Sequence, residues 1–356
     1  MAEEHRARLK RHFSVVAHSP DVVELRHGTW NPVSFTLSDD SRTGALLRVI
    51  GRLNGTATAR EIAATERVPE AQVEALLAEL GRLGALEEGP HHALDYYLDY
   101  VIPNLAPYGQ RRRAEAIPVV LLGDKDITGE IERVLAASAA AGDVRVERTD
   151  PALWDLVERG ARTWWTDPLA FEEEAEAFAP LRERLAVVAG TTLNPLELRA
   201  FNRVSLHHRI PWIQASVDGP FLLVGPTFLP YRTACWDCME TRVEMNLREG
   251  AVYQSYKRAL AEGRATGATG PLDAVLSAML GSYAAFEALN FALTGSSFMT
   301  GKMLAVYLPT MEFTFNEVLR LPGCQACGPS PESDDRELYF ELRALLDGPG
   351  HDGGAG

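Results

Sequence analysis

The placement of the cysteines constrains this chain more than any other feature of its sequence. All four cysteines fall in two matched stretches, CWDC with Cys235 and Cys238, and CQAC with Cys324 and Cys327. Two such turns can close a tetrahedron of thiolates around one zinc ion, because each turn presents both of its sulfurs to the same side. We therefore expect a closed, structural zinc site with no open coordination position for catalysis.

Two other uses of the cysteines stay open. A redox-active CxxC needs an exposed thiol of low pKa at the start of a helix, but it needs only one pair. Structural disulfides suit small secreted domains, whereas this chain has 356 residues and opens with MAEEHRARLK, which lacks the apolar segment of a signal peptide. We expect a cytoplasmic protein in which no apolar run reaches membrane-spanning length.

The length and the net charge of the chain limit the number of domains and the classes of binding partner. A chain of 356 residues is long enough for two domains. We place an N-terminal module at 1–90, a linker at 91–114, an α/β domain at 115–330 and a partly disordered, glycine-rich tail at 331–356. The formal net charge of -14 argues against nucleic-acid and anionic-membrane partners, because either partner needs a basic surface.

The first 90 residues predict a winged-helix-like unit of three strands and three helices. The strands are expected at 13–19, 21–28 and 32–39, and the last of them alternates apolar and polar side chains as a half-buried strand does. Helical spacing of apolar residues begins directly after the third strand. Thr58 with Glu61 forms a capping box that opens the second, short helix.

The third strand and the third helix predict a peptide-binding groove, because a strand edge beside a helix can take an extended peptide by β-augmentation. The helix starts at Pro69 and carries Glu70, Glu74 and Glu79 against a lone Arg82, which makes it a poor DNA-reading helix. A plain packing module is the alternative to peptide binding. The candidate peptide-binding residues are Val33, Phe35 and Leu37 of the strand and Val73, Leu76 and Leu80 of the helix.

The apolar run IPVVLLG predicts a buried parallel strand, but the loop after it departs from a phosphate-binding motif. A dinucleotide fold would continue with GxGxxG, whose glycines let backbone amides approach the phosphates. Here GDKDITG keeps Gly123, places Lys125 and Thr128 at the other two glycine positions, and adds the charges of Asp124 and Asp126. We therefore expect an intact α/β scaffold with a disabled phosphate loop and no bound ATP.

The segments that follow fit a doubly wound sheet, with strands at 185–190 and 211–217 and a helix at 194–209 between them. That helix ends in His207 and His208, and we expect both side chains to be solvated, as is usual on a surface helix. The sequence contains no visible Ser-His-Asp or HExxH arrangement, so we assign no catalytic residue.

The order of motifs around the first cysteine pair resembles a known family. The stretch FNRVSLHHRIPWIQASVDGPFLLVGPTFLPYRTACWDCMETR is similar to the centre of ThiF-like proteins of the ubiquitin-activating-enzyme superfamily. It resembles more closely the ThiF-like partner proteins of YcaO cyclodehydratases in thiazole/oxazole-modified peptide biosynthesis. Residues 271–295 are similar to the long apolar helix of that family, and 303–328 to its closing strands and second zinc pair.

The resemblance, which covers residues 115–328, implies a scaffold that is not catalytic alone. In that family an N-terminal module similar to the PqqD peptide chaperone often binds the leader of a precursor peptide. The leader would lie along the strand 32–38 beside the helix 70–83. A separate YcaO protein would then use ATP to form azolines at cysteine, serine and threonine residues of the precursor. A homodimer is left open.

Two alternatives from other classes remain. The first is an adenylating enzyme of the same superfamily, acting on a peptide, which would need ATP to bind despite GDKDITG. The second is a zinc-stabilised transcriptional regulator, which would need the acidic helix at 70–83 to read DNA.

Overall fold

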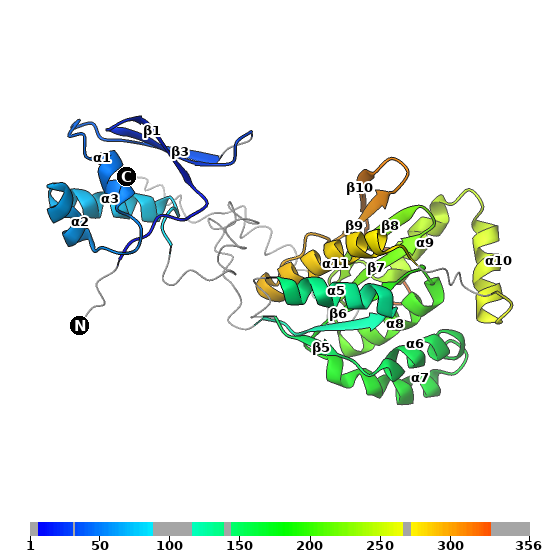
Figure 1. The fold of residues 1–356 in the computed structure, drawn as a ribbon. Helices are drawn as coiled ribbons and strands as arrows, with labels where there is room; N and C mark the ends of the chain where they lie inside the picture. Colours follow the sequence, from blue (N-terminus) through cyan, green and yellow to red (C-terminus); the bar gives the residue numbers. More distant parts are fainter. Residues whose placement is uncertain (1–5, 31–32, 88–115, 139–143, 266–271, 329–356) are drawn as a thin grey trace, which may run out of the picture. The chain divides into compact units, whose positions relative to one another are not determined.

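The computed structural model describes five stretches of the chain, which fall into two units (Figure 1). The described residues are 6–30, 33–87, 116–138, 144–265 and 272–328. Unit 1 lies within Met1–Arg111 and unit 2 within Arg112–Gly356. The predicted linker at 91–114 and the predicted tail at 331–356 lie outside the described residues.

Unit 1 is a three-stranded antiparallel sheet followed by three helices. Its strands are β1 (Ser14–Ser19), β2 (Val22–His27) and β3 (Val33–Ser38), and its helices are α1 (Leu46–Gly51), α2 (Ala59–Glu66) and α3 (Glu70–Arg82). The sheet order is β1-β2-β3, so that β3 is an edge strand, paired with β2 alone among the described residues. This order of strands and helices agrees with the sequence prediction, while the winged-helix assignment stays a prediction.

Local sequence signals explain where the helices of unit 1 begin. Glu61 N–H donates to Thr58 Oγ1 at 3.3 Å, and Thr58 N–H donates to Glu61 Oε2 at 2.9 Å, which is the predicted capping box of α2. Pro69 is the N-cap of α3 rather than its first residue, a shift of one position that is common at helix ends. Val73 and Leu80 of α3 lie in the apolar core of the unit.

Unit 2 is built on a mixed sheet of seven strands in the order β10-β9-β8-β7-β6-β4-β5. The strands are β4 (Val119–Gly123), β5 (Val146–Arg148), β6 (Leu185–Gly190), β7 (Trp212–Asp218), β8 (Phe221–Phe228), β9 (Lys302–Tyr307) and β10 (Glu312–Glu317). β5, β4, β6 and β7 run parallel, whereas β8, β9 and β10 join antiparallel. The predicted apolar runs form the central strands, where helices on both faces exclude water.

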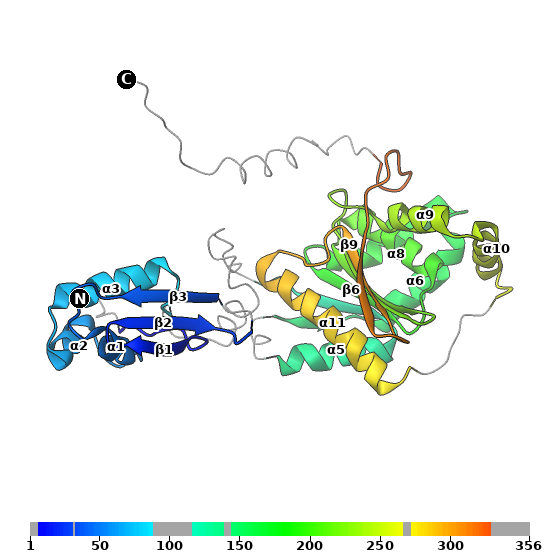
Figure 2. The ribbon, with the colours of Figure 1, turned by 90° about the horizontal axis from the view of Figure 1, so that it is seen from above.

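Helices cover both faces of this sheet (Figures 1 and 2). α5 (Lys125–Ala137) and α11 (Ala274–Thr294) pack against each other on one face, and α11 also contacts β6, β7 and β8. The other face carries a core that includes Trp164, Phe178, Phe201 and Trp212. The other helices are α6 (Pro151–Thr163), α7 (Pro168–Ala175), the 3-10 helix η3 (Glu176–Leu181), α8 (Pro195–His208), α9 (Trp236–Asn246) and α10 (Gly250–Ala261).

The helix α11 contradicts the expectation that no apolar run reaches membrane-spanning length. Its 21 residues are long and apolar enough, by length and composition, to cross a bilayer, so the prediction that no apolar run reaches this length is wrong. However, 56% of its apolar window is buried inside the unit, against α5 and the sheet. These are the contacts of a core helix.

Candidate functional site

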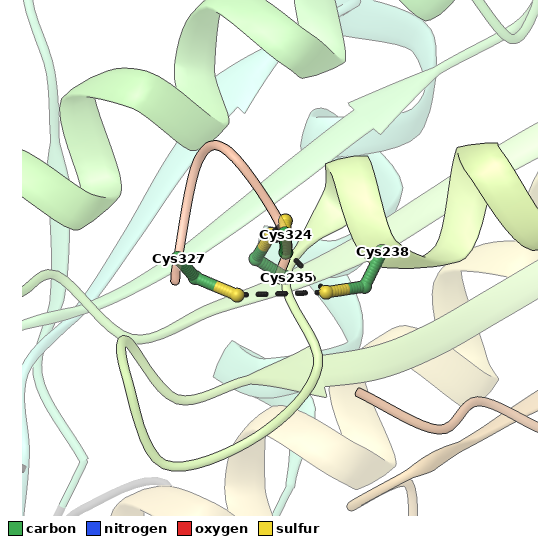
Figure 3. A group of neighbouring side chains, drawn as sticks. All are labelled: Cys235, Cys238, Cys324 and Cys327. Carbon is green, nitrogen blue, oxygen red and sulfur yellow. Dashed lines mark hydrogen bonds between the residues drawn. The ribbon is translucent and has the colours of Figure 1, made fainter. Parts of the chain in front are cut away.

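The two cysteine pairs come together in unit 2 (Figure 3). Cys235 is the N-cap of α9 and Cys238 lies in its first turn, while Cys324 and Cys327 lie in the loop after β10. All four thiols are free and buried, and their sulfurs lie within 4.8 Å of one another. The pairs therefore form one buried cluster that can hold a metal ion.

The sulfur–sulfur distances fit a metal tetrahedron and not disulfides. Sγ of Cys235 lies 3.8 Å from Sγ of both Cys238 and Cys324, and Sγ of Cys238 lies 3.5 Å from Sγ of Cys327. A disulfide requires about 2.05 Å, whereas a tetrahedron of four sulfurs at about 2.3 Å from zinc has edges of about 3.8 Å. Leu321 N–H donates to Sγ of Cys238 at 3.3 Å, a contact that favours the thiolate that a metal binds.

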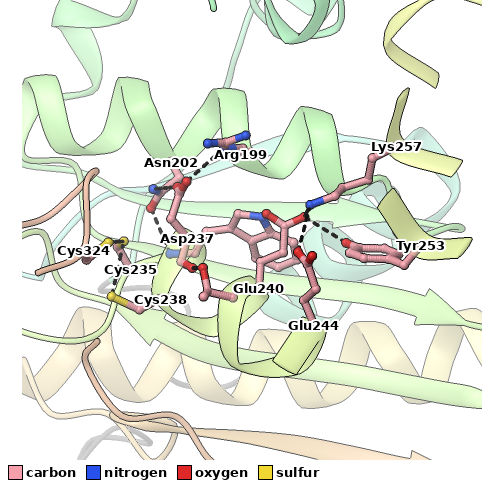
Figure 4. Close-up of polar contacts among 12 residues, drawn as sticks. Arg199, Asn202, Cys235, Asp237, Cys238, Glu240, Glu244, Tyr253, Lys257 and Cys324 are labelled. Carbon is pink, nitrogen blue, oxygen red and sulfur yellow. Dashed lines mark hydrogen bonds and ion pairs between the residues drawn. The ribbon is translucent and has the colours of Figure 1, made fainter. Parts of the chain in front are cut away.

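Side chains of α8 hold the turn that carries the first cysteine pair (Figure 4). Asn202 accepts a hydrogen bond from Trp236 N–H at 3.1 Å and donates from Nδ2 to Asp237 at 2.8 Å. Arg199 donates from Nε to the other carboxylate oxygen of Asp237 at 2.9 Å. These contacts fix the direction in which the CWDC turn presents its sulfurs, as outer hydrogen bonds do around metal ligands.

The loop after β4 keeps one glycine of the nucleotide motif for a reason unrelated to phosphate. Gly123 has a φ of +101°, and a Cβ at this position would lie 2.1 Å from the carbonyl oxygen of Ala189 in β6. Asp124 N–H donates to the same carbonyl at 2.8 Å. The close approach of this loop to β6 therefore requires glycine here.

The carboxylate of Asp124 occupies the amino end of α5. Its Oδ1 accepts from Asp126 N–H at 2.9 Å, and its Oδ2 accepts from the hydroxyl of Thr191 at 2.6 Å. In a nucleotide-binding fold this helix end would face a phosphate. Thr128, at the third glycine position of the motif, donates its hydroxyl to the Asp124 carbonyl at 2.9 Å. The Asp124 carboxylate thus lies where a nucleotide-binding fold would bind a phosphate group.

A cavity of about 790 Å³ lies at the carboxyl ends of β4, β6 and β7, the edge at which open α/β sheets bind their ligands. Among the described residues that line it, Lys125 is the single base, against five acids. The acidic lining residues are Asp124, Asp126, Asp155, Glu158 and Glu197. The charge of this cavity is therefore opposite to the charge that would attract a nucleotide.

In unit 1 a cavity of about 330 Å³ lies between β3, α1 and α3. Half of the predicted peptide-binding residues line it, namely Leu37, Val73 and Leu76. The sequence analysis did not predict that Leu46 and Val49 of α1 also line this cavity. The spacing of these two residues indicates a buried helical face but not which cavity that face borders.

The other three predicted peptide-binding residues do not line this cavity. The ring of Phe35 packs against Phe13, with centroids 5.9 Å apart. Leu80 is fully buried in the core, where a ligand cannot reach it, and Val33 is half-buried at the start of β3. Three of the six predicted residues therefore line the cavity, and their role in peptide binding stays a prediction.

No family model and no curated protein matches the sequence, but solved structures match the fold. The heterocyclase TruD matches over 91% of this chain and 43% of its own, with a TM-score of 0.61 and 23% identity. The microcin C7 biosynthetic enzyme MccB, in complex with N-formylated MccA, matches over 90% of this chain and 99% of its own, with a TM-score of 0.55 and 15% identity. E. coli MccB with AMPCPP and MccA matches at a TM-score of 0.53 and 14% identity, over 91% of this chain and 99% of its own. This chain shares their fold.

At identities below 25% this likeness establishes the fold alone. It agrees with the predicted α/β architecture, because TruD and MccB align over nine-tenths of the chain. The chain spans less than half of the length of TruD, whereas it spans nearly all of MccB.

Of the two histidines at the end of α8, His207 is exposed as expected and His208 is not. His208 is buried, its Nε2–H donates to the Ala175 carbonyl at 2.7 Å, and its Nδ1 accepts from Arg182 at 2.9 Å. Burial lowers the pKa of His208. His207 and Glu176 lie close enough to complete a metal-ligand triad, but both ring nitrogens of His208 are engaged. His208 therefore ties α8 to α7, and the expectation is wrong for this residue.

We expect Glu197→Gln to stabilise the protein at pH 8 and to change its stability little at pH 5. Burial, and then the charge of Glu158, raise the pKa of Glu197 to about 7, while a hydrogen bond from Asn194 and the charge of Arg162 act in the opposite direction. The folded state therefore holds a proton that the unfolded chain has lost, and the free energy of unfolding falls as the pH rises from about 4.5 to about 7. The gain from the substitution at pH 8 is at most about 3 kcal/mol.

Urea unfolding at the two pH values measures this effect. Glu173→Gln, an exposed substitution on α7 with the same change of charge, serves as the control and should be neutral at both. Equal effects of Glu197→Gln at pH 5 and pH 8 would show that the carboxyl of Glu197 titrates normally in the folded protein.

Proposed function

We propose that this chain binds the leader of a ribosomally synthesised precursor peptide and presents the peptide to a YcaO cyclodehydratase, which forms azolines with ATP. The observation that carries the proposal is the fold, shared over 91% of the chain with the heterocyclase TruD and over 90% with a microcin C7 biosynthetic enzyme solved with MccA. One neighbour is a heterocyclase and the other is a biosynthetic enzyme in complex with N-formylated MccA. The YcaO protein is proposed as a separate chain, in the cytoplasm.

The leader would bind in unit 1, which we propose as a PqqD-like module. β3 is an edge strand, so its outer backbone groups can pair with an extended peptide. The cavity beside it, between β3 and α3, offers apolar side chains such as Leu37 and Leu76 within a rim of polar ones. Backbone pairing would supply affinity and the cavity would select an apolar side chain of the leader.

A non-catalytic role is supported by the phosphate loop of unit 2. The carboxylate of Asp124 holds the amino end of α5, and the adjoining cavity is acidic, so a triphosphate would meet repulsion at short range. The chain would then raise turnover by holding the peptide beside its partner, which makes the reaction effectively intramolecular.

The four cysteines fit a structural zinc ion. Their mutual distances match the edges of a tetrahedron, and four thiolates fill its coordination sphere. Cys235, Cys238, Cys324 and Cys327 would hold the ion, which would supply a cross-link between α9 and the loop after β10 rather than chemistry on a substrate.

A second candidate function is an adenylating enzyme, which is favoured by the match to 99% of MccB in its complex with AMPCPP. Omitting components from a reaction mixture separates the two candidates. We expect the isolated chain to consume no ATP at millimolar nucleotide. ATP consumption and azoline formation should require the YcaO protein and the precursor peptide. Lys125→Ala should leave the chain's contribution unchanged, because Lys125 is exposed and the carboxylate of Asp124 already occupies the amino end of α5.

The opposite pattern would favour the adenylating enzyme. ATP turnover by this chain alone, lost on Lys125→Ala, would show that GDKDITG is an alternative phosphate loop. The two readouts are the release of pyrophosphate and the loss of mass from the precursor peptide when an azoline forms.

A further inference from the structure

The cavity of unit 2 is large, sits where this fold binds ligands, and suits a ligand of opposite charge to a nucleotide. Its volume of about 790 Å³ falls within the range of small-molecule sites. Carboxyl groups reach it from three helices: Asp126 from α5, Asp155 and Glu158 from α6, and Glu197 from α8. Asp126, Asp155 and Glu158 are exposed, and negative charge from separate elements favours a positively charged occupant.

The amino ends of α5, α6 and α8 do not reverse the preference of the cavity for a positively charged ligand. Helix amino ends attract anions through free backbone N–H groups. Here the N-cap side chain of each helix takes one of those donors: Asp124 accepts from Asp126 N–H at 2.9 Å, Asp150 from Ala152 N–H at 2.9 Å and Asn194 from Leu196 N–H at 3.1 Å. Two of the three caps are themselves anions.

The remaining wall suits the stem of a long cationic side chain. Trp154 and Tyr256 contribute aromatic rings, which attract cations, and Leu260 contributes an apolar surface for a hydrocarbon stem. Tyr256 and Leu260 come from α10. That helix carries two cations, Lys257 and Arg258. Lys257 is bound to Glu240 of α9 at 3.1 Å, and neither cation lines the cavity.

We propose that this cavity binds the guanidinium or ammonium group of an arginine or lysine side chain carried on a peptide. The carboxylates of α6 face the cation, and the aromatic and apolar residues receive its stem. The site is in unit 2, apart from the leader groove of unit 1, so that either proposal can fail while the other stands.

Calorimetric titration of the full-length protein at low salt tests this site. The probe is the blocked tripeptide acetyl-Ala-Arg-Ala-amide, and its reference is the same peptide with citrulline, which keeps the shape of arginine without its charge. We expect the arginine peptide to bind with a Kd below about 1 mM and the citrulline peptide to bind at least about tenfold more weakly.

Two double variants locate the binding. Asp155→Asn with Glu158→Gln removes two exposed carboxylates of the cavity and should weaken binding of the arginine peptide by at least about tenfold. Glu172→Gln with Glu173→Gln makes the same change of charge on α7, outside the cavity, and should have little effect. Absence of binding, equal affinity for citrulline, equal effects of the two double variants, or binding of ATP in the cavity would each overturn the proposal.

Discussion

Protein purified without chelator is expected to contain about one zinc ion per chain, and Cys324→Ser is expected to lose it together with much of the stability of the fold. All four thiols are buried, so removal of one ligand leaves three sulfurs that must be protonated or desolvated without a metal. The ion would also join segments that lie 89 residues apart in the chain. We expect the Tm to fall by on the order of 10 °C, measured by circular dichroism alongside metal analysis.

The neighbouring residue provides the control for this substitution. Gln325 lies in the same loop between the two cysteines and is exposed, so Gln325→Ser should keep both the zinc and the Tm. Freshly purified protein with about zero zinc, or with Cys235 and Cys238 joined in a disulfide, would contradict the metal assignment.

Deletion of residues 1–90 is expected to abolish binding of the cognate leader peptide, a loss of at least about a hundredfold in affinity. Within the full-length protein, Leu76→Asp should cause a comparable loss, because it places a charge in the cavity between β3 and α3. Fluorescence anisotropy of a labelled leader peptide measures both effects.

A matched substitution on the same helix controls for damage to the fold. Ala78 is exposed on α3 and does not line the cavity, so Ala78→Asp should leave leader binding within about twofold of the wild-type value. Leader binding that survives deletion of residues 1–90 would remove unit 1 from the proposed function.

Patterns that depend on near neighbours in the chain were predictable from the sequence. The three expected strands of unit 1 differ from β1, β2 and β3 by about one residue at each end, because alternation of apolar and polar side chains is a local signal. The capping box of Thr58 and Glu61 is equally local. Each CxxC motif presents both of its sulfurs to the same side. A common site for the two motifs could therefore be expected without knowledge of the sheet.

Features that depend on distant segments could not be predicted. The hydrogen bond from Thr191 to Asp124 spans 67 residues, and no periodicity marks either partner. The same is true of Arg199 and Asp237, which are 38 residues apart. The acidic cavity needs three helices to converge on one edge of the sheet, and the burial of His208 follows from contacts with α7 that the pattern of its own helix does not contain.

The position of the Asp124 carboxylate has a consequence for how this protein would respond to the energy state of a cell. A group fixed to the backbone competes at an effective concentration of millimolar or more, and it never diffuses away. The Asp124 carboxylate therefore acts at the amino end of α5 as a permanently bound competitor of a phosphate group. If the chain binds no ATP, as we propose, a rise or fall in cellular nucleotide would change nothing at this helix. Any sensitivity of the proposed assembly to ATP would then enter through the proposed YcaO partner.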